Sequence, residues 1–448
     1  QAGYWIQPPA VTQGVHTARM MTIGQAPGIT EVEVGGQQVK AWLRAPNSLR
    51  ELWAMSAGHG DRDYLVYRDE RWTYAQAHEE VARIANWLVA NGIGQHDRVA
   101  IAMRNYPEWL LSYWAITSIG AAVVGMNAWW VAEEMRYGLE DSTPKAMICD
   151  RERLERFAEI RDGFEDMVVA AVRVDDVPGW ARPWTDVLAA EPRMPEVTID
   201  PDDDACIFYT SGTTGNPKGV LLSHRNIVAD ANGINAALNT DENKTFLCFL
   251  PLFHVNAMLT CTSSLEKGHQ IVLRKQFSAS EFWEVVDKFK VNFWSAVPAV
   301  YQILLTDPTR QKYDLSSLEF GICGAAPLTE ETMTRFQDTF GIPIVEGYGL
   351  TEGTCVSTIN PRDGVRKIGS IGLALPGQEV VILDEEGNEQ PPNERGEICI
   401  KGDNVMKGYF NKPEATAETL VDGYLRTGDV GIKDEDGYIF IVDRKKDM

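Results

Sequence analysis

The alternation of short apolar segments with amphipathic ones restricts the fold of this 448-residue chain more than any other feature. The segments between the apolar runs, such as SASEFWEVVDKFK (278–290) and TEETMTRFQDTFG (329–341), have the spacing of helices. Repeated strand–helix units predict mostly parallel sheets with helices on both faces, an α/β fold of several layers. The predicted strands are RVAIAMRN (98–105), AAVVGMN (121–127), PKAMICD (144–150), ACIFYT (205–210), KTFLCFLP (244–251), QIVLR (270–274), NFWSAVP (292–298), LEFGICGAA (318–326) and IPIVEGYG (342–349).

The pattern changes after about residue 360. The segments QEVVILDEEGNEQPPNERGEICIKG and GYIFIVDR read as strands joined by acidic Gly/Asn/Pro turns, which is typical of antiparallel pairing. We therefore expect an N-terminal arm over 1–45, α/β subdomains over 46–360 and a small antiparallel β-barrel over 361–442.

Charge and cysteine content exclude several classes of protein. A net charge of −22 argues against non-specific nucleic-acid binding and against docking on anionic lipid. Seven scattered cysteines without C-x-x-C predict buried free thiols in a reducing compartment, and no signal sequence is recognisable, so we expect a cytoplasmic protein. The uncharged stretch 109–132 is long enough to span a membrane, but its polar residues and Gly120 favour a buried helix (107–119) followed by a buried strand (121–127).

The stretch YTSGTTGNPKG (209–219) is rich in backbone donors and hydroxyls. It fits neither the nucleoside-triphosphate loop, which needs Gly-Lys-Ser/Thr, nor the G-x-G-x-x-G fingerprint. A flexible linker is the alternative. Because it lies between an apolar strand and the helix-like segment 223–239, we predict an anion-binding loop in a strand–loop–helix unit.

This stretch and the motifs that follow it in the chain resemble, in the same order, the signature of the adenylate-forming superfamily. That superfamily includes acyl-CoA synthetases, peptide-synthetase adenylation domains and luciferases. The resemblance covers about residue 50 to the end, and PLFHVN and DRKKD are most similar to fatty acyl-CoA ligases. The further motifs are PLFHVNA (251–257), CGAAPLT (323–329), EGYGLTEG (346–353), YLRTGDV (424–430) and DRKKDM (443–448).

The resemblance implies a two-step reaction with ATP, Mg²⁺ and coenzyme A as cofactor or co-substrate. A carboxylic acid attacks the α-phosphate to give acyl-AMP and pyrophosphate, and a thiol then takes the acyl group. The first step joins a carboxylate to a polyanion, so charge neutralisation and positioning must dominate its catalysis. The alternatives are the same adenylation with a carrier-protein acceptor, and a non-catalytic nucleotide- or acyl-binding protein.

The resemblance assigns the phosphate end of the site to the loop and to GYGLTEG. Glu352 is expected to bind Mg²⁺ together with Thr210, although a solvated loop carboxylate is the alternative for Glu352. Thr351 is expected to contact phosphate. The predicted catalytic residues are Lys218, Thr351, Glu352 and Lys446, and the predicted loop contacts are Thr210, Ser211, Gly212, Thr213, Thr214 and Gly215.

The resemblance likewise assigns the adenosine contacts. Tyr348 is expected to stack on adenine, and Asp429 to accept both ribose hydroxyls, since a carboxylate suits a cis-diol. Arg444 is expected to add a ribose or phosphate contact. Lys446 lies in the hinge 443–448, where a solvated charge run is the alternative. The remaining predicted cofactor contacts are Gly324, Ala325, Ala326, Glu346, Gly347 and Gly349.

The acyl site is expected at His254, Val255, Met258 and Val297. A satisfied core histidine is the alternative for His254. Met258 departs from the Trp of some long-chain relatives, so the gating of a fatty-acid tunnel and the chain length stay open. No charged residue lies in LCFLPLFHVNAM or SAVPAVYQ, which favours an apolar acyl group over an amino acid.

In this family a smaller C-terminal domain follows the hinge, and it carries a lysine that bridges the carboxylate and the α-phosphate. We expect this chain to be the large domain alone, and to be impaired in turnover. The N-terminal arm would allow a homodimer, as in some long-chain relatives.

Overall fold

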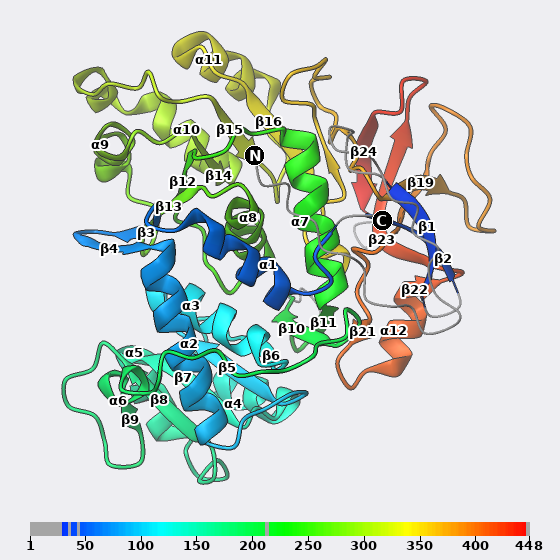
Figure 1. The fold of residues 1–448 in the computed structure, drawn as a ribbon. Helices are drawn as coiled ribbons and strands as arrows, with labels where there is room; N and C mark the ends of the chain where they lie inside the picture. Colours follow the sequence, from blue (N-terminus) through cyan, green and yellow to red (C-terminus); the bar gives the residue numbers. More distant parts are fainter. Residues whose placement is uncertain (1–28, 35–36, 43–44, 211–214, 445–448) are drawn as a thin grey trace.

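The computed structural model describes residues 29–34, 37–42, 45–210 and 215–444, which form two large sheets, one smaller sheet and the hairpin β1 (Ile29–Val34)–β2 (Gln37–Trp42) (Figure 1). The first large sheet is parallel from β10 through β8, and β11 and β21 extend it antiparallel. Its order is β21 (Gly408–Tyr409), β11 (Gly219–Ser223), β10 (Asp204–Tyr209), β6 (Ala122–Gly125), β5 (Arg98–Ala102), β7 (Ala146–Asp150), β8 (Val168–Val172), β9 (Arg182–Pro183).

The second large sheet has nine strands and is parallel from β3 to β16, with antiparallel strands at both edges. The expectation of mostly parallel sheets is confirmed. The strand order is β18 (Leu373–Ala374), β17 (Thr358–Ile359), β16 (Ile344–Tyr348), β15 (Phe320–Cys323), β14 (Phe293–Ala296), β12 (Thr245–Cys248), β13 (Gln270–Leu273), β3 (Asp63–Tyr67), β4 (Glu70–Thr73).

A layer of helices lies between the two large sheets (Figure 1). Its side chains form one core cluster with residues from both sheets, so the two sheets share a single hydrophobic interior. The helices of this layer are α1 (Leu49–Ser56), α2 (Tyr74–Ala90), α3 (Pro107–Ser118), α7 (His224–Leu238) and α8 (Val255–Glu266).

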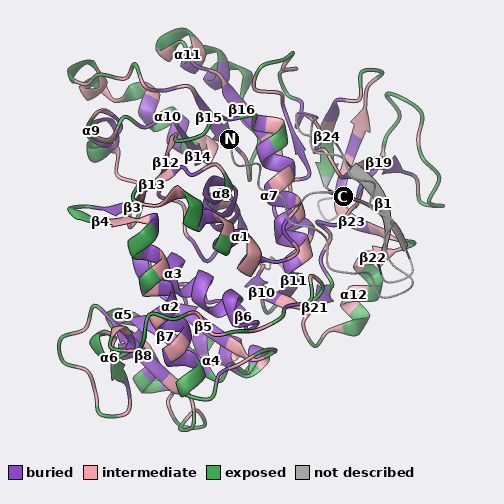
Figure 2. Ribbon diagram, in the orientation of Figure 1, coloured by how far each residue is buried: buried purple, intermediate pink, exposed green. Residues whose placement is uncertain are grey.

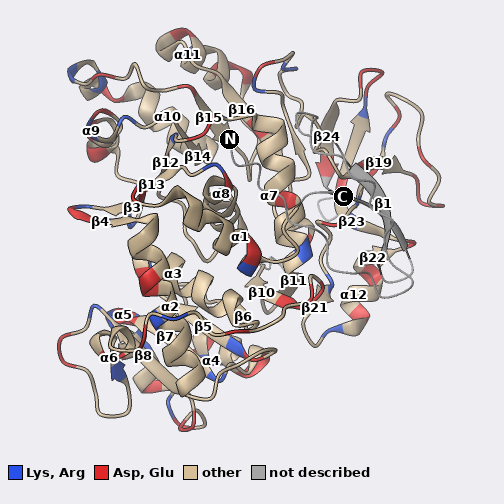
Figure 3. Cartoon of the chain, viewed as in Figure 1, with Lys and Arg blue, Asp and Glu red and all other residues tan. Residues whose placement is uncertain are grey.

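Outer helices cover the remaining faces of the large sheets. They carry much of the charge visible in Figure 3. On the eight-stranded sheet they are α4 (Ala132–Ser142) and α5 (Arg151–Glu159), and on the nine-stranded sheet they are α9 (Ala279–Phe289), α10 (Pro298–Thr306) and α11 (Glu330–Phe340). The short helix α6 (Trp184–Leu188) packs instead beside α2, where Val187 joins the core shared by the two sheets. The short 3₁₀ turns are η1 (Ala57–His59), η2 (Pro308–Lys312) and η3 (Thr351–Gly353).

The uncharged stretch 109–132 belongs to this sandwich. Every residue of α3 is buried, and β6 follows after Gly120, which has φ +76° (Figure 2). A helix between two sheets must be apolar all round, which explains its composition. The prediction of a buried helix and strand is confirmed. Among the described residues, no helix has the length and hydropathy to cross a membrane.

The smaller sheet is antiparallel, as predicted, and contains β19 (Glu379–Leu383), β20 (Gly396–Lys401), β23 (Tyr424–Lys433), β22 (Leu420–Val421) and β24 (Ile439–Arg444). The same part of the chain also supplies β18 and β21 to the two large sheets, and α12 (Pro413–Thr419) packs beside β21. All seven cysteines are buried free thiols.

One sequence-based expectation is wrong. The loop after β10 leads into a strand, β11, and not directly into a helix. Gly219–Ser223 is an apolar run that pairs antiparallel with β10, because its partner strand offers a free edge there. Helix α7 begins only afterwards, with a capping box between Ser223 and Asn226.

Candidate active site

The carboxyl ends of β12, β14, β15 and β16 meet at one edge of the nine-stranded sheet. Ligands of open α/β sheets bind at such an edge. The end of β16 and the segments that follow the other three strands contain candidates for both the acyl and the adenosine contacts, namely His254, Val297, Gly324, Ala325, Ala326, Glu346, Gly347 and Tyr348.

Tyr348 and Asp429 come together from two different sheets. The Tyr348 hydroxyl donates a hydrogen bond of 2.6 Å to Oδ2 of Asp429. Asp429 is 6% exposed and lies on β23, opposite Arg444 of β24. The structure thus brings the predicted adenine-stacking residue and the predicted ribose acceptor into contact, with the backbone of Arg444 beside them. The side chain of Arg444 and the whole of Lys446 lie outside the described residues.

A shelf of small residues lies beside Tyr348. A Cβ on Gly324 would meet the carbonyl oxygen of Gly347 at 3.1 Å, and one on Gly349 would overlap the carbonyl oxygen of Cys355. Ala325 has φ +67°, a left-handed conformation, and with Ala326 it is exposed. The backbone of the turn after β15 therefore runs close to β16, and a flat ring can approach it closely.

Glu346 lies beneath this shelf. Its Oε1 accepts a hydrogen bond of 3.3 Å from the backbone N–H of Leu328, and the side chain is buried. Burial raises the pKa of this carboxyl group, and the Leu328 N–H partly opposes that rise. This hydrogen bond thus ties the segment after β15 to Glu346 on β16.

The predicted phosphate loop is the connection of a β-hairpin. The N–H of Thr210 donates to the carbonyl of Lys218 at 3.0 Å, and the N–H of Lys218 donates to Oγ1 of Thr210 at 3.2 Å. These two bonds close the base of the loop. Gly215 has φ +115°, a conformation that favours glycine. Residues 211–214, with the predicted contacts Ser211, Gly212, Thr213 and Thr214, lie outside the described residues.

Tyr409 links the loop to Glu352. The Nζ atom of Lys218 lies 3.9 Å from the centroid of the Tyr409 ring, and the Tyr409 hydroxyl donates a 2.6 Å hydrogen bond to Oε1 of Glu352. Sequence reasoning missed Tyr409. Its place depends on the pairing of β21 with β11, which no local pattern encodes.

The donor set around Glu352 fits Mg²⁺. The part of the chain that the structure describes has no cluster of three or more His, Cys, Asp or Glu side chains that could hold a metal ion. Mg²⁺ is often bound by one or two carboxylates, with waters and phosphate oxygens completing its shell. A single carboxylate on η3, with one oxygen directed by Tyr409, suits a cation that arrives with a triphosphate.

The candidate acyl residues differ in exposure. His254 precedes α8 and is exposed. Desolvation by the neighbouring protein nevertheless lowers the pKa of its imidazole. Because His254 is accessible to solvent, it is not a histidine whose hydrogen bonds are satisfied inside the core. Val255 is 9% exposed, and Val297, which precedes α10, is half-buried. Met258 is fully buried in the helical layer, where the hydroxyl of Thr262 contacts its sulfur at 3.4 Å.

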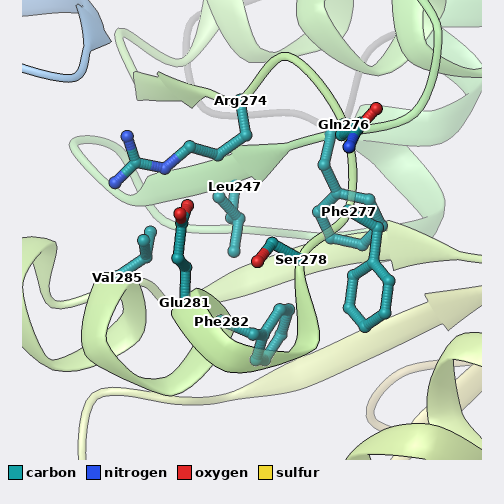
Figure 4. Close-up of a pocket in the computed structure, with 9 residues that line it drawn as sticks. Leu247, Arg274, Gln276, Phe277, Ser278, Glu281, Phe282 and Val285 are labelled. Atoms are coloured by element: carbon teal, nitrogen blue, oxygen red, sulfur yellow. The ribbon is translucent and has the colours of Figure 1, made fainter.

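A separate cavity lies between α9 and the nine-stranded sheet (Figure 4). It measures about 10 Å³, which is room for about one water molecule. The side chains of Arg274 and Glu281 lie at its wall together with Phe282 (Figure 4). Its size excludes it as a nucleotide or acyl site.

Comparison with known proteins gives the family of the chain. The model of the AMP-binding enzyme family matches residues 52–410. A feruloyl-CoA synthase of Amycolatopsis is 36% identical over 380 residues, covering 84% of this chain and 74% of the relative. A long-chain-fatty-acid–CoA ligase of Bacillus subtilis is 32% identical over 438 residues, covering 91% and 78%. The solved fatty acyl-CoA synthetase of Mycobacterium tuberculosis superposes with a TM-score of 0.81 at 30% identity, covering 90% and 79%.

The fold and the family match define a class of AMP-binding enzymes built on helix-covered parallel sheets. The chain belongs to the AMP-binding enzyme family, the adenylate-forming superfamily that contains the acyl-CoA and aryl-CoA ligases.

Proposed function

We propose that this protein activates a fatty carboxylic acid as acyl-AMP, with release of pyrophosphate, and that the acyl group then passes to coenzyme A. The observation that carries the proposal is the contact of Tyr348 with Asp429. This contact places a flat ring, Tyr348, and a carboxylate that can accept from a diol, Asp429, beside the Gly324 shelf. The ring suits the adenine of an adenosine, and the carboxylate suits its ribose.

The proposed chemistry follows from charge. A carboxylate oxygen of the acid forms a bond to the α-phosphorus of ATP, and the bond from that phosphorus to the bridging oxygen breaks, so pyrophosphate leaves. Lys218 and the loop amides would neutralise the departing phosphates, while Glu352 would hold Mg²⁺, which would supply further positive charge there. Asp429 would fix the ribose, so that the acid and the phosphorus stay aligned.

The apolar nature of the acyl side supports a fatty substrate. Val255, Met258 and Val297 supply no charge there, whereas an amino-acid substrate would need a carboxylate for its ammonium group. Met258 is fully buried, so its exposure does not indicate how long an acyl chain the site accepts, and the chain length has to be measured.

The test is exchange of labelled pyrophosphate into ATP with Mg²⁺ and a panel of fatty acids of several lengths, ferulate, 4-coumarate and oxalate. We expect exchange that requires an acid and is strongest with one class of fatty acids. Glu352→Gln should abolish it, while Glu379→Gln, on the antiparallel sheet, should not. Exchange that is stronger with ferulate or oxalate would reject the fatty substrate, and acid-independent ATP hydrolysis would reject the function.

A further inference from the structure

Tyr409 is held in place by backbone bonds on both sides. Its N–H donates to Oγ1 of Thr416 in α12 at 2.9 Å, and its residue pairs with Val220 in β11. Next to it, the N–H of Met406 donates to the carbonyl of Glu352 at 2.9 Å. The side chain is 7% exposed. The ring is therefore fixed relative to both the loop strand and η3.

The hydroxyl of Tyr409 acts on Glu352. In the bond between them the phenol is the donor, because a carboxylate oxygen can only accept. A 2.6 Å bond from a hydroxyl to a carboxylate is charge-assisted and orients that carboxylate strongly. With Oε1 directed toward Tyr409, Oε2 remains available for a cation.

The ring of Tyr409 acts on Lys218. The ammonium group lies 3.9 Å from the ring centroid, within the range of a cation–π contact. Among the described residues, the ammonium group of Lys218 contacts the Tyr409 ring and forms no ion pair with a carboxylate. The aromatic face thus holds the lysine near the loop without neutralising its charge, which stays available for phosphate.

We propose that Tyr409 is a positioning residue with two separable roles, in which its hydroxyl orients Glu352 for Mg²⁺ and its ring places Lys218 for the triphosphate. The inference rests on the proposed function, and it adds a residue that joins the metal end of the site to the phosphate loop.

Two substitutions separate the roles. Tyr409→Phe keeps the ring and removes the hydroxyl, so the Mg²⁺ concentration for half-maximal pyrophosphate exchange should rise about tenfold, which corresponds to losing about 1.4 kcal/mol of a charge-assisted bond. Its affinity for ATP without metal should stay within about twofold of the wild type. Tyr409→Leu removes both contacts, so it should show the same Mg²⁺ shift and also bind metal-free ATP about threefold to tenfold more weakly.

A matched control exists on the antiparallel sheet. The hydroxyl of Tyr424 donates a bond of the same 2.6 Å length to Oε1 of Glu379. Tyr424→Phe removes a similar tyrosine–glutamate bond away from the site, so it should change neither the Mg²⁺ dependence nor the ATP affinity.

The results can overturn the proposal. Equal effects of Tyr409→Phe and Tyr409→Leu on both quantities would refute the separate roles. A lower melting temperature in both variants, with unchanged Mg²⁺ and ATP dependence, would reduce Tyr409 to a packing residue. If the wild type exchanges no pyrophosphate with any acid, the proposed function fails, whereas calorimetric titration of ATP and Mg²⁺ into the same variants still decides the role of Tyr409.

Discussion

The two large sheets have similar architecture but different carboxyl edges. At the end of β6 in the eight-stranded sheet, a Cβ on Gly125 would lie 2.7 Å from the Phe208 ring, so side chains fill this part of the edge, beside the phosphate loop that follows β10. At the end of β15 in the nine-stranded sheet, the turn of Gly324, Ala325 and Ala326 leaves an open shelf. Parallel strands provide an edge, and the residues that follow them decide whether it is a site.

An ion pair closes the eight-stranded sheet at β7. Asp150 accepts from Nε of Arg153 at 2.7 Å, and their side chains are 6% and 1% exposed. A further guanidinium nitrogen of Arg153 donates to the carbonyl of Ala128 at 2.9 Å. At β7 this edge therefore uses its charges within the fold, whereas the predicted phosphate loop follows β10 at the same edge.

The largest effect is expected from breaking that closed edge. Arg153→Met leaves Asp150 buried without its partner, so the free energy of unfolding should fall by about 3–5 kcal/mol, measured by urea denaturation. AMP binding by the folded fraction should be unchanged. The control is Arg193→Met, whose exposed pair with Glu196 at 4.0 Å should matter by less than about 1 kcal/mol. Equal losses in the two variants would contradict the comparison.

Filling the open edge should affect binding before stability. Gly324→Val places a branched side chain on the shelf, 3.1 Å from the carbonyl oxygen of Gly347 at its Cβ. We expect AMP affinity, measured calorimetrically, to fall about tenfold, or about 1.4 kcal/mol. Gly179→Val is the matched control, because nothing lies within 4 Å of its Cβ and its φ is not positive. Wild-type AMP affinity in Gly324→Val would show that no ring binds there.

The effect that appears only on acidification concerns two histidines that follow strands of different sheets. His224, after β11, is fully buried, its Nδ1 accepts from the N–H of Leu49 at 3.2 Å, and burial lowers its pKa to about 4. The unfolded chain, with a histidine pKa of about 6.5, binds more protons between these values, so stability is present above about pH 6.5 and is lost as the pH falls toward 4.

His224→Gln should therefore reduce the slope of unfolding free energy against pH, by about 1.4 kcal/mol per pH unit at most. His254→Gln, at the open edge, should reduce it less, because that ring is already exposed. Urea denaturation at several pH values between 4 and 7 measures both slopes. A larger change in this slope for His254→Gln than for His224→Gln would contradict the conclusion that His224 is the more buried of the two histidines.

Local pattern predicted the features that depend on local physics. Apolar runs identified most of the parallel strands, although β3 and β8 were missed, and the composition of 107–127 identified α3 and β6. The assignment of Tyr348 and Asp429 to one nucleotide came only from the resemblance, and the hydrogen bond between them was not predicted. Pairing between distant segments was not predictable, so β11 was taken for part of a loop–helix unit and Tyr409 was missed.

The helical layer shared by both large sheets has a consequence for how the molecule comes apart. Because α3 and α8 bury side chains against each sheet, removing either sheet would expose a wide apolar face of the other half. The two sheets should therefore melt in one cooperative transition, and a fragment that carries only one of them should aggregate. The halves of this enzyme cannot be separated and recombined as modules, because the interior that stabilises each of them belongs to both.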